Sequence, residues 1–305
     1  MKGKSSLIGQ IVILIFIASV AGCANFNYTG LDSPKPIEAV AAISPKPKIA
    51  LVLGSGGPRG FAHIGVMRVF EEDGIDYDLV VGSSVGSVIG AFWASGYSAS
   101  QIDEISKDGG PFTVFDFSVF ADRGWIHGQR LQDFVNTRLS DQAIENMPKK
   151  FIAVATRIED KQPVFFNSGN VGVAVRASSA VSKIFSPVGI EGVEYEDGDE
   201  SLPVAVRAAR QAGADFVIAI DVAPRLEKAP PDTSSSRMER EGRRRQRIDP
   251  ELALADFVIQ PDLDFQTYPT PSFFKHARNA GEDIARALLP QIKHAMSTKF
   301  VMGER

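Results

Sequence analysis

Apolar positions along the chain fall into short continuous runs and into stretches with helical spacing. The run at residues 49–53 ends at glycines, as a buried parallel strand does. Apolar positions three and four apart then predict a helix from about Gly60 to Gly74. A second strand, residues 79–81, is followed by another helical stripe over residues 85–92. Two successive strand, turn and helix units predict a mainly parallel sheet with crossover helices, which is an α/β fold.

The rest of the chain continues this alternation. Ser98 and Gln101 have the spacing of a capping box, which predicts that a third helix begins there. Further strands are predicted at residues 151–155, 216–220 and 257–259, and further helices at residues 203–212 and 273–294. Four phenylalanines in a less regular region are interpreted mainly as core residues, with an apolar groove as the alternative. They are Phe112, Phe115, Phe117 and Phe120.

Composition is that of an ordinary globular protein. The 305 residues are 44% apolar and 23% charged, and the formal net charge is -4. This balance gives no electrostatic reason to expect a nucleic acid as partner. We expect one large α/β domain over residues 48–305. Within it we expect a core at 48–222, a basic loop at 223–249 and a C-terminal part at 250–305.

The N-terminal region predicts export. Lysines, a short apolar run and small residues before Cys23 make a secretory signal peptide over residues 1–22. The apolar run is shorter than a bilayer span needs, and a single membrane anchor is the alternative. Prolines and weak periodicity predict a tether over residues 23–47. Cys23 is the only cysteine, so it cannot form an internal disulfide, and a role as acyl acceptor is its simplest use.

The same segment resembles a bacterial lipoprotein signal with its lipobox. The resemblance implies cleavage before Cys23, diacylation of its sulfur and hence a membrane as partner. Ala24, rather than aspartate, follows the cysteine, as in lipoproteins that are sent on to the outer membrane. We therefore expect a lipid-anchored protein of the bacterial cell envelope, on the periplasmic face of the outer membrane.

A basic segment interrupts the apolar pattern at residues 223–249. Residues 237–247 carry six arginines against two glutamates. One interpretation is a solvated loop or charged helix. The other is a patch that rests on anionic phospholipid headgroups, since each basic side chain adds on the order of 1 kcal/mol near such a surface.

The sequence G-S-S-V-G at residues 82–86 matches the pattern G-x-S-x-G. It follows an apolar strand and opens an amphipathic helix, which is the setting of a nucleophile elbow. Gly82 and Gly86 would leave room for close approach of strand and helix, and the helix N-terminus would favour an alkoxide at Ser84. A simple N-cap serine is the alternative.

A second glycine turn, residues 54–60, follows the first predicted strand. It lacks the lysine of a P-loop, and Arg59 stands where a dinucleotide-binding turn needs glycine. These departures count against a phosphate-binding loop of a nucleotide fold, and the other interpretation is an oxyanion hole. In the second case, amides of the turn would converge on one point, with Arg59 holding the loop or adding charge.

An acidic turn precedes the helix predicted at residues 203–212. Residues 196–200 include four carboxylates, and a raised pKa is expected in one of them where they are desolvated. By itself such a turn is most often a solvated loop. Paired with Ser84, Asp197 becomes a candidate base.

Together these motifs resemble the patatin-like phospholipase family. The resemblance covers roughly residues 48–222 and includes A-S-S-A-V at 177–181 and F-S-P at 185–187. It implies a three-layer α/β/α fold and a Ser-Asp dyad, in which Ser84 attacks the acyl carbonyl and Asp197 takes the proton.

The resemblance also implies the remaining parts of the site and its substrate. The amides of Gly56 and Gly57 would stabilise the oxyanion, and Arg59 would order the loop. The implied substrates are phospholipids, lysophospholipids or other acyl-ester lipids.

The chain departs from the family pattern at two positions. The aspartate turn of the family usually continues Gly-Gly or Gly-Ala, whereas Asp199 stands here in the third place. Ser55 occupies a position where many members have glycine. An extra carboxylate beside Asp197 could raise its pKa or disturb the turn, and a non-catalytic lipid-binding envelope lipoprotein is therefore one alternative function.

The four histidines leave a second enzymatic alternative. Residue order permits an α/β-hydrolase triad of Ser84, then Asp197 or Asp221, then His276. His63 follows the glycine turn and is interpreted as a structural residue. The histidines have no metal-ligand spacing, so we expect no structural metal. We also expect no cofactor. The sequence favours a serine acyl-ester hydrolase that uses a Ser-Asp dyad at a membrane surface.

Overall fold

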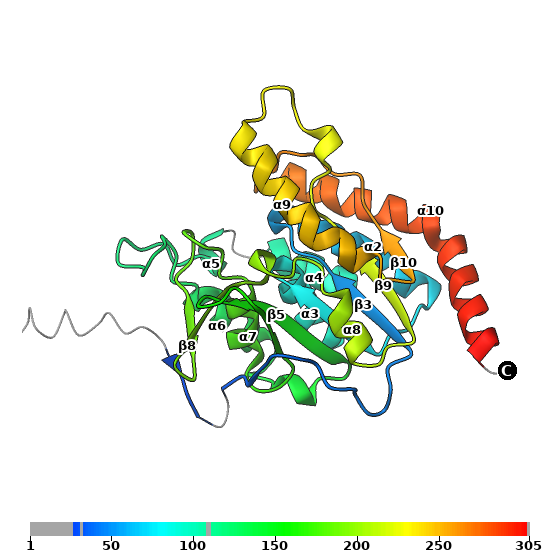
Figure 1. Cartoon of the computed structure of the whole chain (residues 1–305), viewed down its shortest axis with the longest axis horizontal. Coiled ribbons are helices and arrows are strands. Elements are labelled where there is room, and N and C mark those ends of the chain that lie inside the picture. The colour runs from blue at the N-terminus through cyan, green and yellow to red at the C-terminus, as the bar shows by residue number, and fades with distance from the viewer. Residues whose placement is uncertain (1–26, 31–32, 108–110, 304–305) are drawn as a thin grey trace, which may run out of the picture.

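The computed structural model describes residues 27–30, 33–107 and 111–303. This part of the chain forms a mixed, mostly parallel sheet of ten strands with helices on both faces, which confirms the predicted fold class (Figure 1). The strand order is β1-β7-β8-β5-β4-β3-β9-β10, with β6 beside β5 and β2 beside β6. The strands are Asn27–Tyr28 (β1), Pro36–Ile37 (β2), Ile49–Leu53 (β3), Leu79–Ser83 (β4), Lys150–Arg157 (β5), Pro163–Phe166 (β6), Val188–Ile190 (β7), Val193–Asp197 (β8), Phe216–Ile220 (β9) and Phe257–Ile259 (β10).

Helices connect the parallel strands. The α-helices are Phe61–Asp73 (α2), Val85–Ala94 (α3), Ala99–Lys107 (α4), Pro111–Val114 (α5), Gln129–Arg138 (α6), Val171–Ser178 (α7), Val206–Gln211 (α8), Ser235–Leu252 (α9) and Pro271–Gly303 (α10). Short 3-10 turns lie at Gly57–Gly60 (η1), Ile144–Asn146 (η2), Gly198–Glu200 (η3) and Leu226–Lys228 (η4). Two predicted boundaries are confirmed: Gly74 ends α2 with a φ of 72°, and Ser98 and Gln101 exchange capping-box hydrogen bonds before α4.

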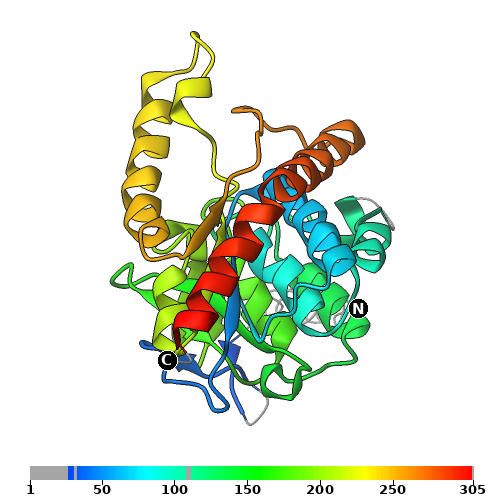
Figure 2. The same cartoon turned by 90° about the vertical axis from the view of Figure 1, so that its right-hand side faces the viewer.

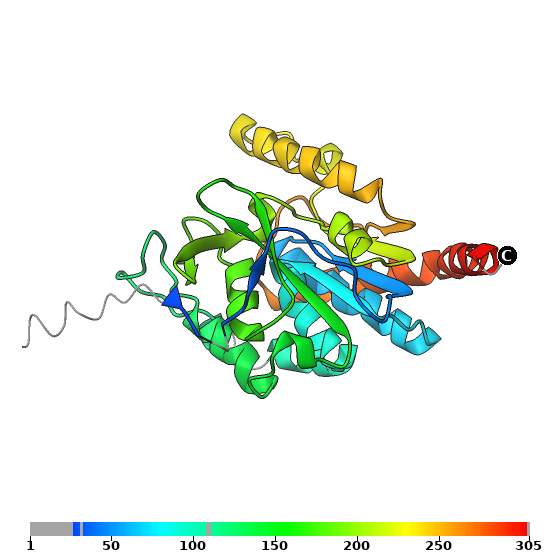
Figure 3. The same cartoon turned by 60° about the horizontal axis from the view of Figure 1, so that its bottom comes forward.

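Alternate side chains of the central strands enter two separate hydrophobic cores. In β3, Leu51 and Leu53 join a core built with α2, α3 and α10, whereas Ala50 and Val52 join a second core with α8 and part of α9. Figure 3 shows α9 (yellow) and α2 (light blue) on opposite sides of the sheet. Because both faces are covered, these strands are apolar throughout, which explains their continuous apolar runs in the sequence.

Helices α2 and α10 pack against each other (Figure 2), and each carries a glycine at the contact. A Cβ atom on Gly65 would lie 2.0 Å from the carbonyl oxygen of Arg278, and one on Gly281 would lie 2.0 Å from that of Ala62. Both positions therefore require glycine. Helix α10 continues to residue 303, beyond the end predicted near residue 294.

Strand β5 positions the ends of two other strands. Its residues 153 and 154 pair with both β4 and β6, and its residues 155 and 156 pair with both β6 and β8. Strands β4 and β8 therefore lie on the same side of β5, opposite β6. Since β4 is parallel to β5 and β8 is antiparallel to it, these two strands run toward each other and end at neighbouring residues of β5.

The predicted tether at residues 23–47 is wrong for the part that the structure describes. Strand β1 pairs in parallel with β7, β2 pairs with β6, and Val40 is buried in the second core. Strands of two residues are too short to show a period, and proline is tolerated at a sheet edge, so no pattern in the sequence predicted strands here. Cys23 and the predicted signal peptide lie outside the described residues.

The predicted basic loop at residues 223–249 is wrong in its second half. Residues 235–252 form α9, which is the charged-helix interpretation of this segment. The buried positions of α9 are Arg244, Ile248 and Glu251, spaced as one face of a helix. The sequence did not predict a buried helix face in this segment, because two of these three residues are charged. Helix α8 begins at Val206, three residues after the predicted start.

The core prediction for the phenylalanines of residues 112–120 is wrong at two positions. Phe117 is 57% exposed and Phe120 is 79% exposed. They lie on a projecting hairpin, residues 117–126, closed by an antiparallel bridge between Phe117 and Ile126. Phe115 is partly buried against the ring of Phe185, and the side chain of Phe112 is outside the described set. Among the helices that the structure describes, none is both long and apolar enough to cross a bilayer.

Candidate active site

Ser84 sits at the sharp turn between β4 and α3. Its backbone has a φ of 54° and a ψ of -126°, a strained conformation for a residue other than glycine, and it is the N-cap residue of α3. Flanking glycines permit the turn. A Cβ atom on Gly82 would lie 2.4 Å from the Gly86 carbonyl oxygen, and one on Gly86 would lie 2.2 Å from that of Leu53. Ser84 therefore has the geometry of a nucleophile elbow.

The Ser84 hydroxyl donates a hydrogen bond of 2.6 Å to Asp197 Oδ2. These residues are 113 positions apart in the chain. Strand β5 brings them together, since Ser83 pairs with Val154 and Asp197 pairs with Ala155. The contact links a hydroxyl directly to a carboxylate, without an intervening imidazole.

Asp197 is almost completely enclosed, with 2% of its surface exposed. Burial, together with the nearby Asp199 carboxylate, raises its pKa to about 8. Hydrogen bonds from the Ser84 hydroxyl and the Asp199 amide oppose the rise, as does the charge of Arg244. The raised pKa expected in the acidic turn is therefore confirmed at Asp197, and it makes the carboxylate a stronger base than an exposed aspartate.

The turn that carries Asp197 is fixed by close packing. A Cβ atom on Gly198 would lie 2.4 Å from the Val154 carbonyl oxygen and 2.5 Å from Ser83 Oγ. Thr156 donates a hydrogen bond of 2.7 Å to the Asp197 carbonyl oxygen. The Asp199 amide donates to Asp197 Oδ1 at 2.8 Å, so that Oδ2 is directed to Ser84.

The glycine turn after β3 lies against the start of α3. A Cβ atom on Gly60 would lie 2.4 Å from Val85, the residue after Ser84. The amides of Gly54 and Ser55 donate to the carbonyl groups of Ile220 and Pro203. Among the described residues, the amides of Gly56 and Gly57 have no hydrogen-bond partner. They are thus available to an oxyanion, and Gly57 has the positive φ of 55° that favours glycine.

Arg59 is buried and ties the glycine turn to the segment before α10. Its guanidinium donates to the carbonyl oxygens of Asp264, at 3.1 Å, and Phe265. Burial, with Arg244 nearby, lowers the pKa of Arg59 to about 10, so it remains charged at neutral pH. Its contacts are those of a residue that orders the loop.

His63 forms a hydrogen bond with the same glycine turn. It is fully buried, and its Nε2 lies 2.9 Å from the Gly54 carbonyl oxygen. Burial lowers its pKa to about 4, so the ring is neutral near pH 7 and Nε2–H donates to the carbonyl. This agrees with the structural role expected for His63.

Arg244 contacts the candidate site, a position that the sequence did not predict for it. Its Nε donates to Asp199 Oδ1 at 2.7 Å, and its Nη2 donates to the carbonyl oxygen and the hydroxyl of Ser55 at 2.9 Å each. The Ser55 hydroxyl also donates to Asp199. Arg244 is one of six arginines in its segment, and nothing in that run distinguishes it from its neighbours.

The residues of the alternative triad have other partners. Asp221 accepts hydrogen bonds from Arg245, from Gln260 at 2.8 Å and from the Ala223 amide at 2.9 Å. His276 is half exposed, and its Nε2 lies 4.0 Å from Asp264. The Ser84 hydroxyl is directed to Asp197 instead.

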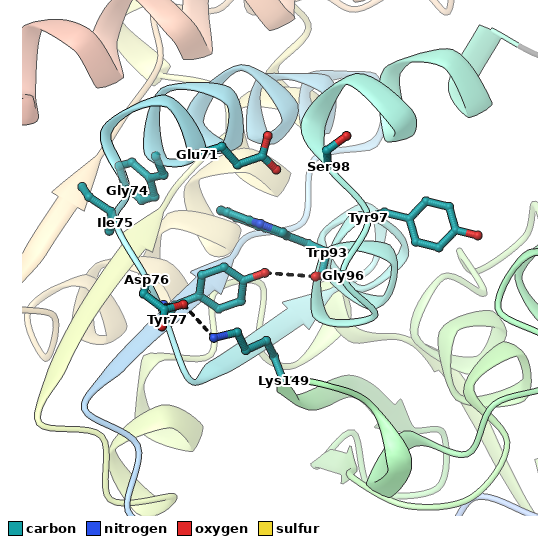
Figure 4. Close-up of a pocket in the computed structure, with 11 residues that line it drawn as sticks. Glu71, Gly74, Ile75, Asp76, Tyr77, Trp93, Gly96, Tyr97, Ser98 and Lys149 are labelled. Carbon is teal, nitrogen blue, oxygen red and sulfur yellow. Dashed lines mark hydrogen bonds and ion pairs between the residues drawn. The ribbon is translucent and has the colours of Figure 1, made fainter.

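A surface pocket of about 380 Å³ lies away from this site (Figure 4). It is lined by the segment before β4 and by the turn between α3 and α4, where Lys149 bonds to Asp76 and Tyr77 packs against Trp93. These residues mark the start of β4, whereas Ser84 follows its end. In the described ranges, no group of three or more His, Cys, Asp or Glu side chains could hold a metal ion.

Comparison with known proteins identifies relatives over part of the chain. An uncharacterised NTE family protein of Mycobacterium tuberculosis is 32% identical over 195 residues, which are 62% of this chain and 53% of that protein. A lysophospholipase of Aspergillus fumigatus is 31% identical over 179 residues, 57% of this chain and 12% of that protein. The chain thus spans about half the length of the mycobacterial relative and a small part of the fungal one.

The fold is also found among solved structures. VipD from Legionella pneumophila aligns with a TM-score of 0.53 over 86% of this chain and 71% of that chain, at 11% sequence identity, which shows a shared fold. Residues 51–206, just over half of the sequence, match the patatin-like phospholipase family and include the glycine turn, Ser84 and Asp197. The chain belongs to the patatin-like phospholipase family.

Proposed function

We propose that this protein is a serine acyl-ester hydrolase that acts on lipids, with Ser84 as nucleophile and Asp197 as base. The observation that carries the proposal is the 2.6 Å hydrogen bond from the Ser84 hydroxyl to a buried carboxylate. A hydroxyl at a strained turn, a base in contact with it and two amides that have no hydrogen-bond partner in the described part of the chain are the parts that acyl transfer requires.

The proposed reaction has two halves. Ser84 Oγ attacks the ester carbonyl carbon while its proton passes to Asp197 Oδ2, and the amides of Gly56 and Gly57 bind the oxyanion. Protonated Asp197 then gives the proton to the departing alcohol, which leaves an acyl-serine. Water attacks this ester with Asp197 again as base, and the free acid departs as Ser84 regains its proton.

The proposed substrates are acyl esters of phospholipids and lysophospholipids. The fungal relative is named a lysophospholipase, and the family is that of patatin-like phospholipases. Family membership favours this class over peptides or soluble amides.

Action at a membrane surface is supported by the 117–126 hairpin. Val119, Phe120 and Trp125 are all more than 60% exposed, and aromatic side chains favour the boundary between lipid and water. The hairpin is connected to the site. The Trp125 amide donates to the carbonyl oxygen of Ile184, and four residues earlier the Ala180 carbonyl oxygen accepts from the Asp197 amide.

The lipid anchor at Cys23 is a further proposal, and the position of β1 is compatible with it. Figures 1 and 3 show β1 and the 117–126 hairpin at the same end of the molecule. The Tyr28 hydroxyl bonds to Gln129, just after the hairpin, at 2.9 Å. Asn27 is four positions after Cys23, a reach of at most about 14 Å. An acylated Cys23 would bring this end of the protein to the bilayer of the bacterial envelope.

Active-site labelling tests the proposal most directly. A fluorophosphonate probe should label the wild type at Ser84, and Ser84→Ala and Asp197→Asn should each lower turnover of a p-nitrophenyl ester at least about 1,000-fold. His276→Ala is the matched control and should retain activity, because its side chain has no contact with Ser84 or Asp197. Collapse of activity in His276→Ala would favour the triad. A folded wild-type protein that is never labelled would favour the non-catalytic alternative.

A further inference from the structure

The two residues that depart from the family pattern are in direct contact. Asp199 stands after the Asp197–Gly198 pair, and Ser55 stands in the glycine turn. They are 144 positions apart, yet the Ser55 hydroxyl donates to Asp199 Oδ1. Each departure therefore supplies the hydrogen-bonding partner of the other, across the gap between the base and the glycine turn.

Arg244 joins this pair with a fork of donors. Nε reaches Asp199 Oδ1 at 2.7 Å, while Nη2 reaches the Ser55 carbonyl oxygen and hydroxyl at 2.9 Å. The guanidinium thus bonds to both turns at once. It is buried, with 8% of the residue exposed, so its charge has little help from solvent.

Helix α9 holds Arg244 in this position. Ile248, one turn further on, is buried in the second core. Glu251, also fully buried, accepts from the backbone amide of Arg207 at 2.8 Å and from its guanidinium. Arg247 adds a bond of 3.2 Å to the Asp199 carbonyl oxygen. The part of the helix that follows Arg244 is therefore fixed to the domain.

We propose that Arg244 is a positioning residue of the active site, which clamps Asp199 to Ser55 so that a carboxylate can occupy the position after Asp197–Gly198 without disabling the base. The inference rests on the proposed function of Ser84 and Asp197. It assigns to one arginine of the basic segment a role at the site rather than at a lipid surface.

The physical reason is the proximity of two carboxylates. Asp199 raises the pKa of Asp197, and Arg244 opposes that effect. The nearby Asp199 and Glu241 carboxylates raise the pKa of Arg244 above its usual value despite burial, so Arg244 stays charged. The Asp199 amide also aligns Asp197 by donating to its Oδ1, so movement of Asp199 would move the base.

Other charged groups surround this cluster. Glu241, also on α9, lies 3.7 Å from Arg244, and Arg59 lies close enough for its pKa to respond to Arg244. Glu196 is paired with Lys161. Glu200, with its pKa raised by burial, completes the acidic turn. Of these groups, Arg244 is the cation that touches Asp199 through its side chain.

The test compares Arg244→Ala with Arg243→Ala in the full chain. Arg243 is the neighbouring arginine on α9, largely exposed and 3.8 Å from Glu239, so its removal makes the same charge change on the same helix. With a soluble p-nitrophenyl ester, Arg244→Ala should lower kcat/KM by about 10- to 100-fold at pH 7 and move the acidic limb of the pH profile upward by about one unit. Arg243→Ala should change neither quantity by more than about twofold.

A second substitution that restores activity distinguishes a positioning role of Arg244 from a general structural role. Asp199→Gly restores the third-place glycine of the family turn. In the Arg244→Ala background, this second substitution should recover most of the lost kcat/KM. It should also return the acidic limb of the pH profile to lower pH. Arg244→Lys should keep the limb near that of the wild type, because the charge remains. It should still lose several-fold in kcat, because an ammonium lacks the planar fork that bonds to both turns.

Two results would overturn the inference. One is an Arg244→Ala profile that coincides with that of Arg243→Ala. The other is a loss in Arg244→Ala that Asp199→Gly does not reduce. If Arg244→Ala does not fold, the soluble Arg244→Lys variant decides instead. A pH profile and a kcat that both equal those of the wild type would then exclude the clamp. Failure of the proposed function can be distinguished from failure of this inference. If the proposed function is wrong, activity survives Ser84→Ala in the otherwise unchanged chain.

Discussion

Ser83 and Asp197 end two strands that run toward each other along the same side of β5, where they pair with its consecutive residues Val154 and Ala155. The distance between the candidate nucleophile and base is therefore set by one step along a buried strand rather than by a flexible loop. A site built on strand ends is held more rigidly than one built on loops. This explains how residues so distant in sequence form a hydrogen bond of 2.6 Å.

Activity should rise with pH through a limb near 8. Asp197 must be ionised to take the Ser84 proton, and burial raises its pKa to about 8. Below the limb, kcat/KM for a soluble ester should fall about tenfold for each pH unit. Initial rates between pH 5.5 and 9.5, corrected for spontaneous hydrolysis, measure this. A flat profile across that range would contradict the assignment of Asp197 as the base.

Asp197→Asn should stabilise the protein increasingly as pH rises. The folded pKa of about 8 lies above the ordinary 3.8, so the stability associated with the protonated group is fully present below about pH 4 and is lost as pH rises toward 8. Asparagine cannot ionise and avoids this loss. The Tm of the variant should therefore exceed that of the wild type by several degrees at pH 9, and by less at pH 5. An equal Tm difference at both pH values would show that Asp197 does not titrate in this range.

Gly198→Ala should abolish the proposed esterase activity while leaving most of the fold intact. An added Cβ would lie 2.4 Å from the Val154 carbonyl oxygen and 2.5 Å from Ser83 Oγ, so the turn carrying Asp197 must shift. Displacement of a base by about 1 Å can lower rates about 100-fold. Gly242→Ala is the control, because a Cβ there has no neighbour within 4 Å. Comparable activity of the two variants would exclude a requirement for glycine at position 198.

Much of the architecture was predictable because the central strands are buried on both faces. The runs at β3, β4 and β9 are continuous and apolar, and the elbow at Ser84 follows one of them directly. The glycine turn was recognisable for the same reason. The approach of Asp197 to Ser84 was expected only from the family resemblance. No local sequence pattern indicates that β8 runs antiparallel to β5.

The parts that the sequence failed to predict depend on contacts between distant segments. Strands β1 and β2 have two residues each and exist because β7 and β6 offer open edges. The buried role of Arg244 depends on Asp199 and Ser55, both far from it in sequence, so a charged run gave no indication of which arginine faces inward. Phe117 and Phe120 were expected to be buried because they are apolar, but they lie exposed on a projecting hairpin.

Cys23→Ala should release the protein from the membrane fraction or block its maturation. The reason is that Cys23 is the only cysteine and hence the one sulfur available for acylation. Detergent partitioning and metabolic labelling with a fatty-acid analogue measure the change, and Ala24→Ser is a control that leaves the sulfur in place. Unchanged membrane association together with no incorporated lipid in the wild type would exclude the anchor.

Removal of aromatic side chains from the 117–126 hairpin should impair attack on lipid in vesicles but not on a soluble ester. Phe120 and Trp125 are 79% and 66% exposed, and each contributes about 1.5–3 kcal/mol when fully buried in an apolar phase. The double variant Phe120→Ala/Trp125→Ala should therefore lower vesicle turnover at least about tenfold, with little change for a p-nitrophenyl ester. Leu254→Ala, which removes an exposed apolar side chain beyond the end of α9, is the matched control and should leave both activities near wild type. Equal losses on both substrates would mean that the hairpin shapes the catalytic site, and no loss on either would contradict a role of the hairpin at a membrane.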